Sequence, residues 1–274
     1  MRPPVVPLRP LGGADILDGA VRLVRRHARA AFALSVPFAI VRAVLDAALN
    51  LATGSTLTQI GVLGGLVIAG GFGTILTGLL TPVFAGDLLG EQVPGRDALR
   101  RVGRRWWPLA VLAIAAALAE NAGLATLVVG VWLWGVWAVA APAMIVEGLG
   151  IRRSFGRSIE LVRSMFWRTW GLRALGWVLT WVLGLFVELP FLVAAGVLAD
   201  ANPFDTSRSG TASGLYVAVS AIGTLLSVAL VAPVTSAVEV LLYLDLRMRR
   251  EGMDIVLALE PQPRAGTPST VTAW

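Results

Sequence analysis

The sequence predicts an all-α integral membrane protein, a bundle of about six transmembrane helices combined with basic amphipathic helices. The chain of 274 residues is 56% hydrophobic and only 15% charged, whereas soluble domains carry roughly 25% charged residues. Apolar stretches long enough to cross the hydrocarbon core recur along the chain. Arginine-rich segments lie before every second stretch, which indicates that one face of the bilayer receives the basic segments.

The charge and the rare residue types exclude several classes of function. All 23 basic residues are arginine, and the formal net charge is +6. These arginines lie between apolar runs, where membrane orientation explains them better than nucleic-acid binding does, so no nucleic-acid partner is expected. The chain has no cysteine and one histidine, His27, which excludes disulfides, thiol catalysis and metal sites built on these residues. We expect no cofactor and no metal.

The chain divides into an arm, one membrane domain and a tail. Prolines interrupt residues 1–11, which predicts an extended cytoplasmic arm rather than a signal peptide. The membrane domain is expected over 12–254, and the tail over 255–274 is expected to be cytoplasmic and disordered at its end. The expected spans lie near 30–51, 60–89, 106–122, 124–147, 170–199 and 215–246.

The first two spans differ in composition. The first carries Arg42 and Asp46 at i, i+4 spacing, so that the two side chains can pair on one helix face or bind an anionic headgroup. The second is rich in glycine, and small residues allow close helix packing in lipid. We therefore expect the second span to be buried among the others.

The middle of the chain predicts two short spans. Trp106 and Trp107 follow a basic segment at the level expected for interfacial tryptophans. From there to Val146 the chain is almost wholly apolar, too long for one span and sufficient for two. The polar residues between Glu120 and Gly123 predict the turn.

The last two spans carry further acidic residues. Glu188 lies beside Pro190 inside the fifth span, where it is either a proton or ligand site or a residue paired near the outer interface. Glu239 lies toward the cytoplasmic end of the sixth span and is expected to bond arginines there. The candidate intramembrane polar site therefore consists of Arg42, Asp46, Glu188 and Glu239.

Three basic amphipathic segments precede the first, third and fifth spans. Each is expected to lie in the membrane interface as a helix and to contact anionic lipid headgroups, at about 1 kcal/mol per arginine. The alternative is that these arginines only set orientation. The candidate headgroup contacts are Arg22, Arg25, Arg26, Arg100, Arg101, Arg104, Arg152, Arg153 and Arg157.

The arginine distribution also predicts the topology. Segments before spans one, three and five and after span six hold nearly all arginines, whereas the other loops hold only Arg208. The positive-inside rule then places both termini in the cytoplasm of a bacterial cell, with the chain in the inner membrane.

An internal repeat accompanies this pattern. Each unit is a basic amphipathic helix followed by a two-span hairpin, which gives a possible threefold repeat. The second span of each hairpin contains a proline followed by an acid, and these pairs are Pro82 and Asp87, Pro142 and Glu147, and Pro233 and Glu239. A shared kink would free backbone carbonyls at similar depths.

Two segments resemble a known family. The run RPLGGADILDGAVRLVRRH over 9–27 resembles the N-terminal signature of the bacterial membrane domain associated with glycerophosphoryl diester phosphodiesterases, and LYLDLRMRREGMD over 242–254 resembles its close. The segment 146–168 is also similar. The resemblance implies the fold and a membrane location, while the family's phosphodiesterase activity belongs to a separate barrel domain for which this chain has no room.

The leading hypothesis is a non-enzymatic inner-membrane protein that acts as a scaffold or lipid-associated accessory. Its partners would be membrane lipids with anionic headgroups and an unidentified membrane or cytoplasmic protein. The alternative is a small transporter or permease subunit, which the prolines in the spans, Glu188 and the repeats favour. A lipid-acting enzyme ranks third, because it would need at least two acids, or an acid and a histidine, at one depth, which the sequence does not suggest.

Overall fold

The computed structural model describes residues 11–51, 55–89, 95–124, 128–199 and 214–252, and within these ranges the chain is helical without strands. The all-α prediction is therefore confirmed. The elements are α1 (Gly13–Arg26), α2 (Ala28–Leu51), α3 (Ser55–Leu88), α4 (Gly95–Gly103), α5 (Trp106–Leu124), α6 (Val128–Val136), α7 (Ala140–Val146), α8 (Ile151–Val162), α9 (Phe166–Leu198) and α10 (Gly214–Glu251). Residues 1–10 of the expected arm and the whole of the expected tail over 255–274 lie outside the described residues.

Five stretches are long and apolar enough to cross a membrane. They lie in α2, α3, α9 and α10 and in the combined stretch Val128–Val146. A sixth appears only when α4 and α5 are counted as one span, and these two helices meet at a bend of 75°. The membrane character of the chain agrees with the sequence prediction at this coarser level.

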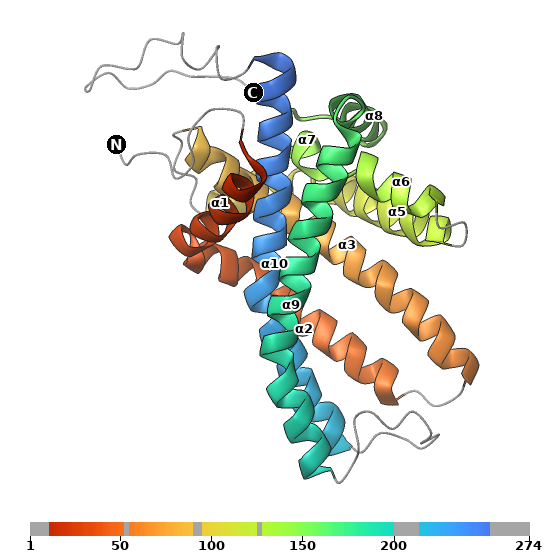
Figure 1. Ribbon diagram of the computed structural model, residues 1–274. Coiled ribbons are helices and arrows are strands. Elements are labelled where there is room, and N and C mark those ends of the chain that lie inside the picture. The colour runs from red at the N-terminus through yellow and green to blue at the C-terminus, as the bar shows by residue number, and fades with distance from the viewer. Residues whose placement is uncertain (1–10, 52–54, 90–94, 125–127, 200–213, 253–274) are drawn as a thin grey trace.

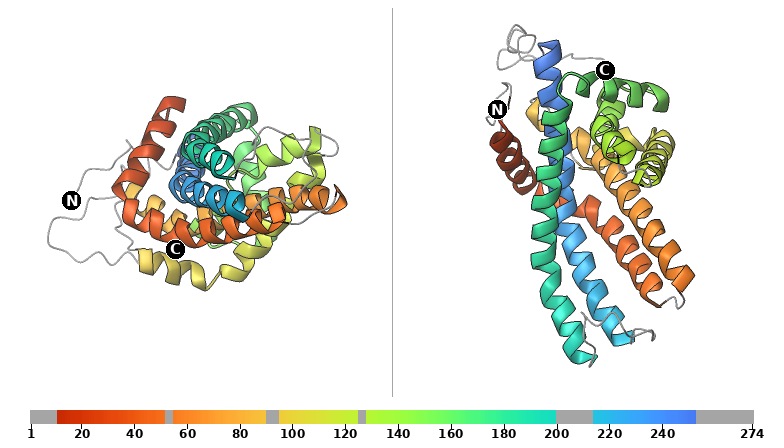
Figure 2. Two further views of the ribbon diagram at one scale, coloured as in Figure 1. Left: turned by 90° about the horizontal axis from the view of Figure 1, so that it is seen from below. Right: turned by 45° about the vertical axis from the view of Figure 1, so that its right-hand side comes forward.

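The helices form two long hairpins and one shorter one (Figure 1). Helices α9 and α10 run side by side, and α2 packs against α10. The far ends of α2 and α3 diverge from those of α9 and α10 (Figure 2). The third hairpin, α5 with α6 and α7, lies beside the upper part of α3 and α9 and ends at a shallower level than the other two.

The third hairpin differs from the expected pair of spans in two ways. Helix α5 continues to Leu124, so the turn expected between Glu120 and Gly123 was wrong. Asn121 stays helical because its Nδ2 donates to the carbonyl of Ala117 at 2.7 Å, one turn earlier. The following span is broken at 137–139, since Pro142 has no N–H and its ring clashes with the carbonyl four residues before it.

Ser158 of α8 compensates for this break. Its Oγ donates to the carbonyl of Val136 at 2.7 Å and accepts from the N–H of Val139 at 3.3 Å. Ser158 is fully buried, so these backbone groups have no access to water. A serine on a basic helix therefore makes the broken span possible inside the protein.

The main core lies at the end of the molecule that carries the basic helices. Helix α10 passes through it, and Tyr243 of α10 and Phe84 of α3 are among its largest fully buried side chains. The opposite part of α9 exposes large apolar residues, with Phe186 72% and Val197 76% exposed. Such a surface is stable against hydrocarbon rather than water, as the membrane assignment requires.

The basic helices had been expected to lie in the membrane interface. In the structure their apolar faces pack against the protein instead of facing its surroundings. Ile16, Ala20 and Leu23 of α1 are fully buried, and α1 packs on α10. Ala98 of α4 and Leu161 of α8 are buried in the same way. The reason is that α10 and α3 extend far enough at this end to cover these faces, which leaves the arginine faces outside.

Candidate lipid-contact surface and buried ion pairs

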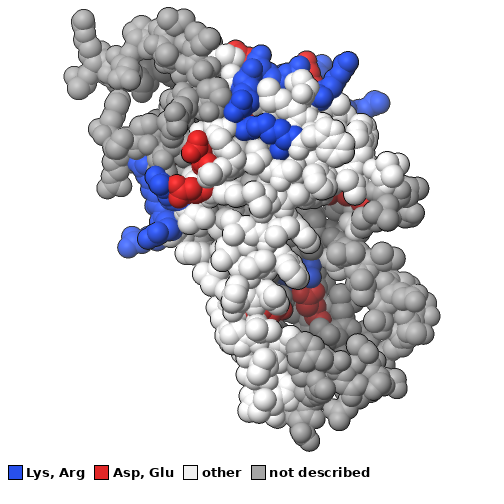
Figure 3. Space-filling view, in the orientation of Figure 1, with Lys and Arg blue, Asp and Glu red and all other residues white. Residues whose placement is uncertain are grey.

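Helices α1, α4 and α8 present arginines at one end of the molecule. In the face drawn in Figure 3, blue atoms gather on the upper half, while most of the lower half is uncharged apart from a recess that shows both signs. Arg25, Arg100, Arg104, Arg152 and Arg153 are exposed. None of these five has a carboxylate within ion-pair distance among the described residues. They form what we call the free arginine set.

The other arginines predicted to contact headgroups are engaged within the protein. Arg22 pairs with Asp18 at 2.6 Å on the surface of α1. Arg26 reaches Asp87 of α3 at 3.4 Å. Arg101 is exposed but has a partner of its own. Arg157 lies in a network of carboxylates, and its side chain is only 21% exposed.

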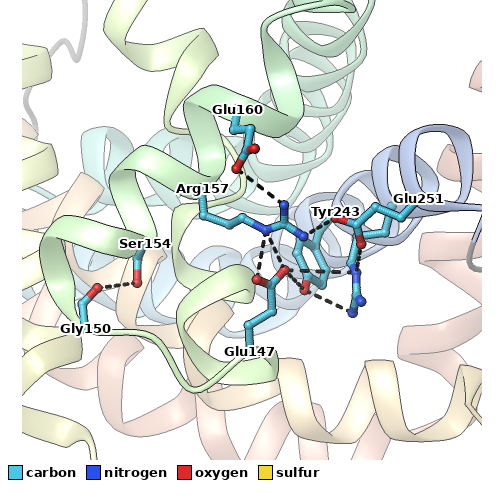
Figure 4. Close-up of polar contacts among 8 residues, drawn as sticks. Glu147, Gly150, Ser154, Arg157, Glu160, Tyr243 and Glu251 are labelled. Carbon is cyan, nitrogen blue, oxygen red and sulfur yellow. Dashed lines mark hydrogen bonds and ion pairs between the residues drawn. The ribbon is translucent and has the colours of Figure 1, made fainter.

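Arg157 ties α8 to α7 and α10 (Figure 4). Its Nε donates to both carboxylate oxygens of Glu147, at 3.0 and 2.8 Å, and its Nη2 donates to Glu251. Tyr243 donates to Glu147 at 2.9 Å, and Arg247 donates to Glu251 at 2.9 Å. Burial alone lowers the pKa of Arg157, but the bonds to Glu251 and Glu147 outweigh it and raise that pKa. Arg157 therefore stays charged, and its ion pairs hold α8 against α7 and α10.

A second network fastens the start of the described chain to α10. The backbone N–H of Leu11 donates to Oδ1 of Asp245 at 2.8 Å, and Asp245 is fully buried. Arg168 and Arg249 both bond to Asp245, and both donate to the carbonyl of Leu11, at 2.7 and 2.8 Å. Two arginines and one aspartate thus hold the backbone that leads into α1.

A third pairing joins the α1–α2 corner to α3. Asp87 has a side chain that is 4% exposed, and it faces Nε of Arg26 at 3.4 Å and Nε2 of His27 at 3.3 Å. His27 lies with 21% side-chain exposure against this carboxylate, because the chain turns there from α1 into α2.

The acids of the proline–acid pattern take part in contacts between helices. Asp87, Glu147 and Glu239 each pair with an arginine from another helix, and these arginines are Arg26, Arg157 and Arg173. One freed carbonyl is also satisfied: Pro233 leaves Ala229 without its helical donor, and Ser35 of α2 donates to that carbonyl at 2.8 Å. The acids therefore join helices instead of marking one shared site.

The four residues of the predicted intramembrane site are not brought together. Arg42 pairs with Asp46 at 2.7 Å, as predicted, and its Nη1 donates to the carbonyl of Gly65 in α3 at 3.0 Å. Glu188 accepts from Thr224 of α10 at 3.0 Å. Arg42 and Glu188 thus each bond to a neighbouring helix, while Asp46 pairs with Arg42 within α2.

Glu239 lies in the most extensive buried polar contact of the apolar segments. It accepts from Arg173 of α9 at 3.0 Å and from Thr77 of α3 at 2.8 Å. Arg173 also bonds to the carbonyl of Trp134 in α6, and its guanidinium lies 4.6 Å from that ring's centroid. Glu120 of α5 approaches the same arginine at 4.0 Å. Five helices, α3, α5, α6, α9 and α10, thus meet around the ion pair of Arg173 with Glu239.

Sequence reasoning missed Arg173. The signal was present, because Arg173 is a charge inside an apolar stretch, and such a charge requires a partner in lipid. Its partners, however, lie more than 30 residues away in the chain, and no spacing rule predicts them. Among the described residues no group of three potential metal ligands is found.

The chain matches no family model, and comparison with curated proteins and with solved structures found no similar protein at a significant level. The resemblance to the phosphodiesterase-associated membrane domain therefore rests on the quoted residues alone. What this chain does has to be argued from its own geometry.

Proposed function

We propose that this chain is a non-enzymatic integral membrane protein, a scaffold or lipid-associated accessory whose basic helices contact anionic lipid headgroups. The observation that supports it is the free arginine set, which lies on α1, α4 and α8 and, for Arg104, directly after α4. The opposite faces of these helices are packed on the core. Rigid helices hold these guanidinium groups outward, where phosphate is the natural partner. The resemblance stated above is compatible with this role.

The proposed arrangement has six membrane-embedded helices with both termini on the basic, cytoplasmic side of a bacterial inner membrane. These helices are α2, α3, α5, the α6–α7 pair, α9 and α10. The third hairpin, α5 with α6 and α7, would enter the membrane less deeply than the other two. The order of the elements supports a threefold repeat, in which α1, α4 and α8 each precede one hairpin.

The lipid contact is tested by reconstituting the full chain in bilayers that contain spin-labelled lipids. We expect a larger motionally restricted fraction for labelled phosphatidylglycerol than for labelled phosphatidylcholine, and salt should reduce the difference. Equal fractions for the two lipids at low salt would refute the headgroup contact.

A transporter or permease subunit is the second candidate, and the contact between Arg173 and Glu239 favours it. Buried charges where several helices meet are typical of transport pathways. A transport role requires water at this place in some state of the protein. Single cysteines at Thr77 and Ser236 would then react with a small hydrophilic thiol reagent, whereas a purely structural contact leaves both unreactive.

A further inference from the structure

Three members of the free arginine set come from two segments that meet. Arg104 directly follows α4 in the connection to α5, and Arg152 and Arg153 lie in the first turn of α8. All three are exposed, and within the described ranges none of them has a carboxylate partner. Such unneutralised guanidinium groups repel one another unless an anion lies among them.

The protein holds these two segments against each other. Nη1 of Arg105 donates to the carbonyl of Leu149, just before α8, at 3.2 Å. Below this bond, Val102 belongs to a small separate core on which Ile151 and Phe155 of α8 pack. The position of the three arginines is therefore fixed by packing and does not depend on their own contacts.

The surface next to the arginines has the character of a membrane interface. Trp106 and Trp107 follow directly, are 61% and 63% exposed, and lie edge to face with centroids 5.5 Å apart. Exposed tryptophans of this kind sit at the headgroup level of bilayers. Further along α5, Ile114 and Leu118 are 53% and 52% exposed, and their spacing from Trp107 puts all three on one helix face.

We propose that the junction of α4–α5 with α8 is a binding site for one anionic phospholipid. The phosphate lies among Arg104, Arg152 and Arg153, the two tryptophans flank the glycerol region, and an acyl chain follows Ile114 and Leu118 along α5. This proposal rests on the proposed function and narrows it to one site. On α1, only Arg25 belongs to the free arginine set, because Arg22 and Arg26 pair with Asp18 and Asp87.

The test compares two variants of equal charge change. Arg152→Gln with Arg153→Gln removes two arginines of the site, and Arg25→Gln with Arg29→Gln removes two exposed arginines of the α1 region. Native mass spectrometry of the detergent-solubilised full chain counts bound phosphatidylglycerol and phosphatidylcholine with matched acyl chains. We expect the first phosphatidylglycerol to bind about tenfold or more weakly to the site variant, and normally to the α1 variant.

Further measurements make each outcome decisive. Unfolding midpoints in neutral detergent should match in both variants, and Arg104→Gln alone should weaken the same first binding step. Equal loss in both double variants would show a diffuse attraction and overturn the site, while leaving the proposed function intact. No preference of the unmodified protein for phosphatidylglycerol would overturn both. Competition by soluble glycerol phosphate at equal concentration would show that the site takes free anions, and would also overturn the lipid assignment.

Discussion

At the scale of single residues, the arginines divide into two kinds that the sequence does not distinguish. Arg152 and Arg157 lie five residues apart on α8, yet Arg152 is exposed and has no ion-pair partner among the described residues, while Arg157 pairs with three carboxylates. The difference arises from Glu147 and Glu251, which α7 and α10 bring to one face of α8. Tertiary packing therefore decides which basic residues remain available to lipid.

Among single substitutions, we expect the largest loss of stability at Asp245. Asp245→Asn removes the charge that two arginines share while leaving both in place, and breaking a buried pair typically costs 3–5 kcal/mol. We expect a loss of about 3 kcal/mol in the free energy of unfolding, at the low end because Arg168 and Arg249 are partly exposed. Unfolding of the purified protein in mixed micelles of increasing denaturing detergent measures it.

Asp18→Asn is the matched control for this measurement. Asp18 also pairs with an arginine, but both side chains are about 60% exposed, so the change should cost less than about 1 kcal/mol. Equal effects of the two substitutions would mean that the network around Leu11 does not stabilise the fold.

At the scale of elements, the break between α6 and α7 depends on Ser158. Ser158→Ala would leave the carbonyl of Val136 and the N–H of Val139 buried without partners, at a cost of about 1–3 kcal/mol. Ser164→Ala, an exposed position beyond the end of α8, should change stability by less than about 0.5 kcal/mol. The same unfolding assay compares them, and an unchanged Ser158→Ala variant would contradict the role given to this hydroxyl.

The sequence predicts the elements better than their contacts. Apolar length predicts the long helices, and the amphipathic pattern predicts α1, α4 and α8, because both signals are local. The interruption at 137–139 could not be predicted from such a local signal, since Pro142 alone would equally allow a continuous helix, as Pro233 does in α10. The pairing of Glu120 with Arg173 is also invisible in the sequence, and for this reason Glu120 was placed in a turn.

The depth to which the third hairpin enters the membrane distinguishes two complete crossings from a shallow insertion. Val128 opens α6 and is 78% exposed. Because the hairpin ends at a shallower level than α9 and α10, we expect Val128→Cys to remain unlabelled by an impermeant thiol reagent added to intact cells. Labelling equal to that of a cysteine at the far end of α10 would instead show two complete crossings.

At the scale of the whole molecule, the long helices exceed the bilayer. Helix α9 has 33 residues and α10 has 38, which correspond to about 50 and 57 Å, against a hydrocarbon core of about 30 Å. Part of each must therefore lie outside the hydrocarbon, or tilt within it. The part of α10 that extends beyond the hydrocarbon is polar at the basic end, since Arg247, Arg249 and Arg250 lie in its last turns.

This distribution of charge predicts which end faces the cytoplasm. The chain has no native cysteine, so single substitutions report their own positions. Gly214→Cys at the start of α10 and Ser164→Cys between α8 and α9 are both exposed positions, and they lie at opposite ends of the α9–α10 hairpin. The positive-inside rule predicts that an impermeant reagent labels Gly214→Cys in intact cells and Ser164→Cys only after permeabilisation. The reverse pattern would place the arginines outside, where the inner leaflet's anionic lipids cannot reach them, and the lipid role proposed for these helices would fail with the orientation.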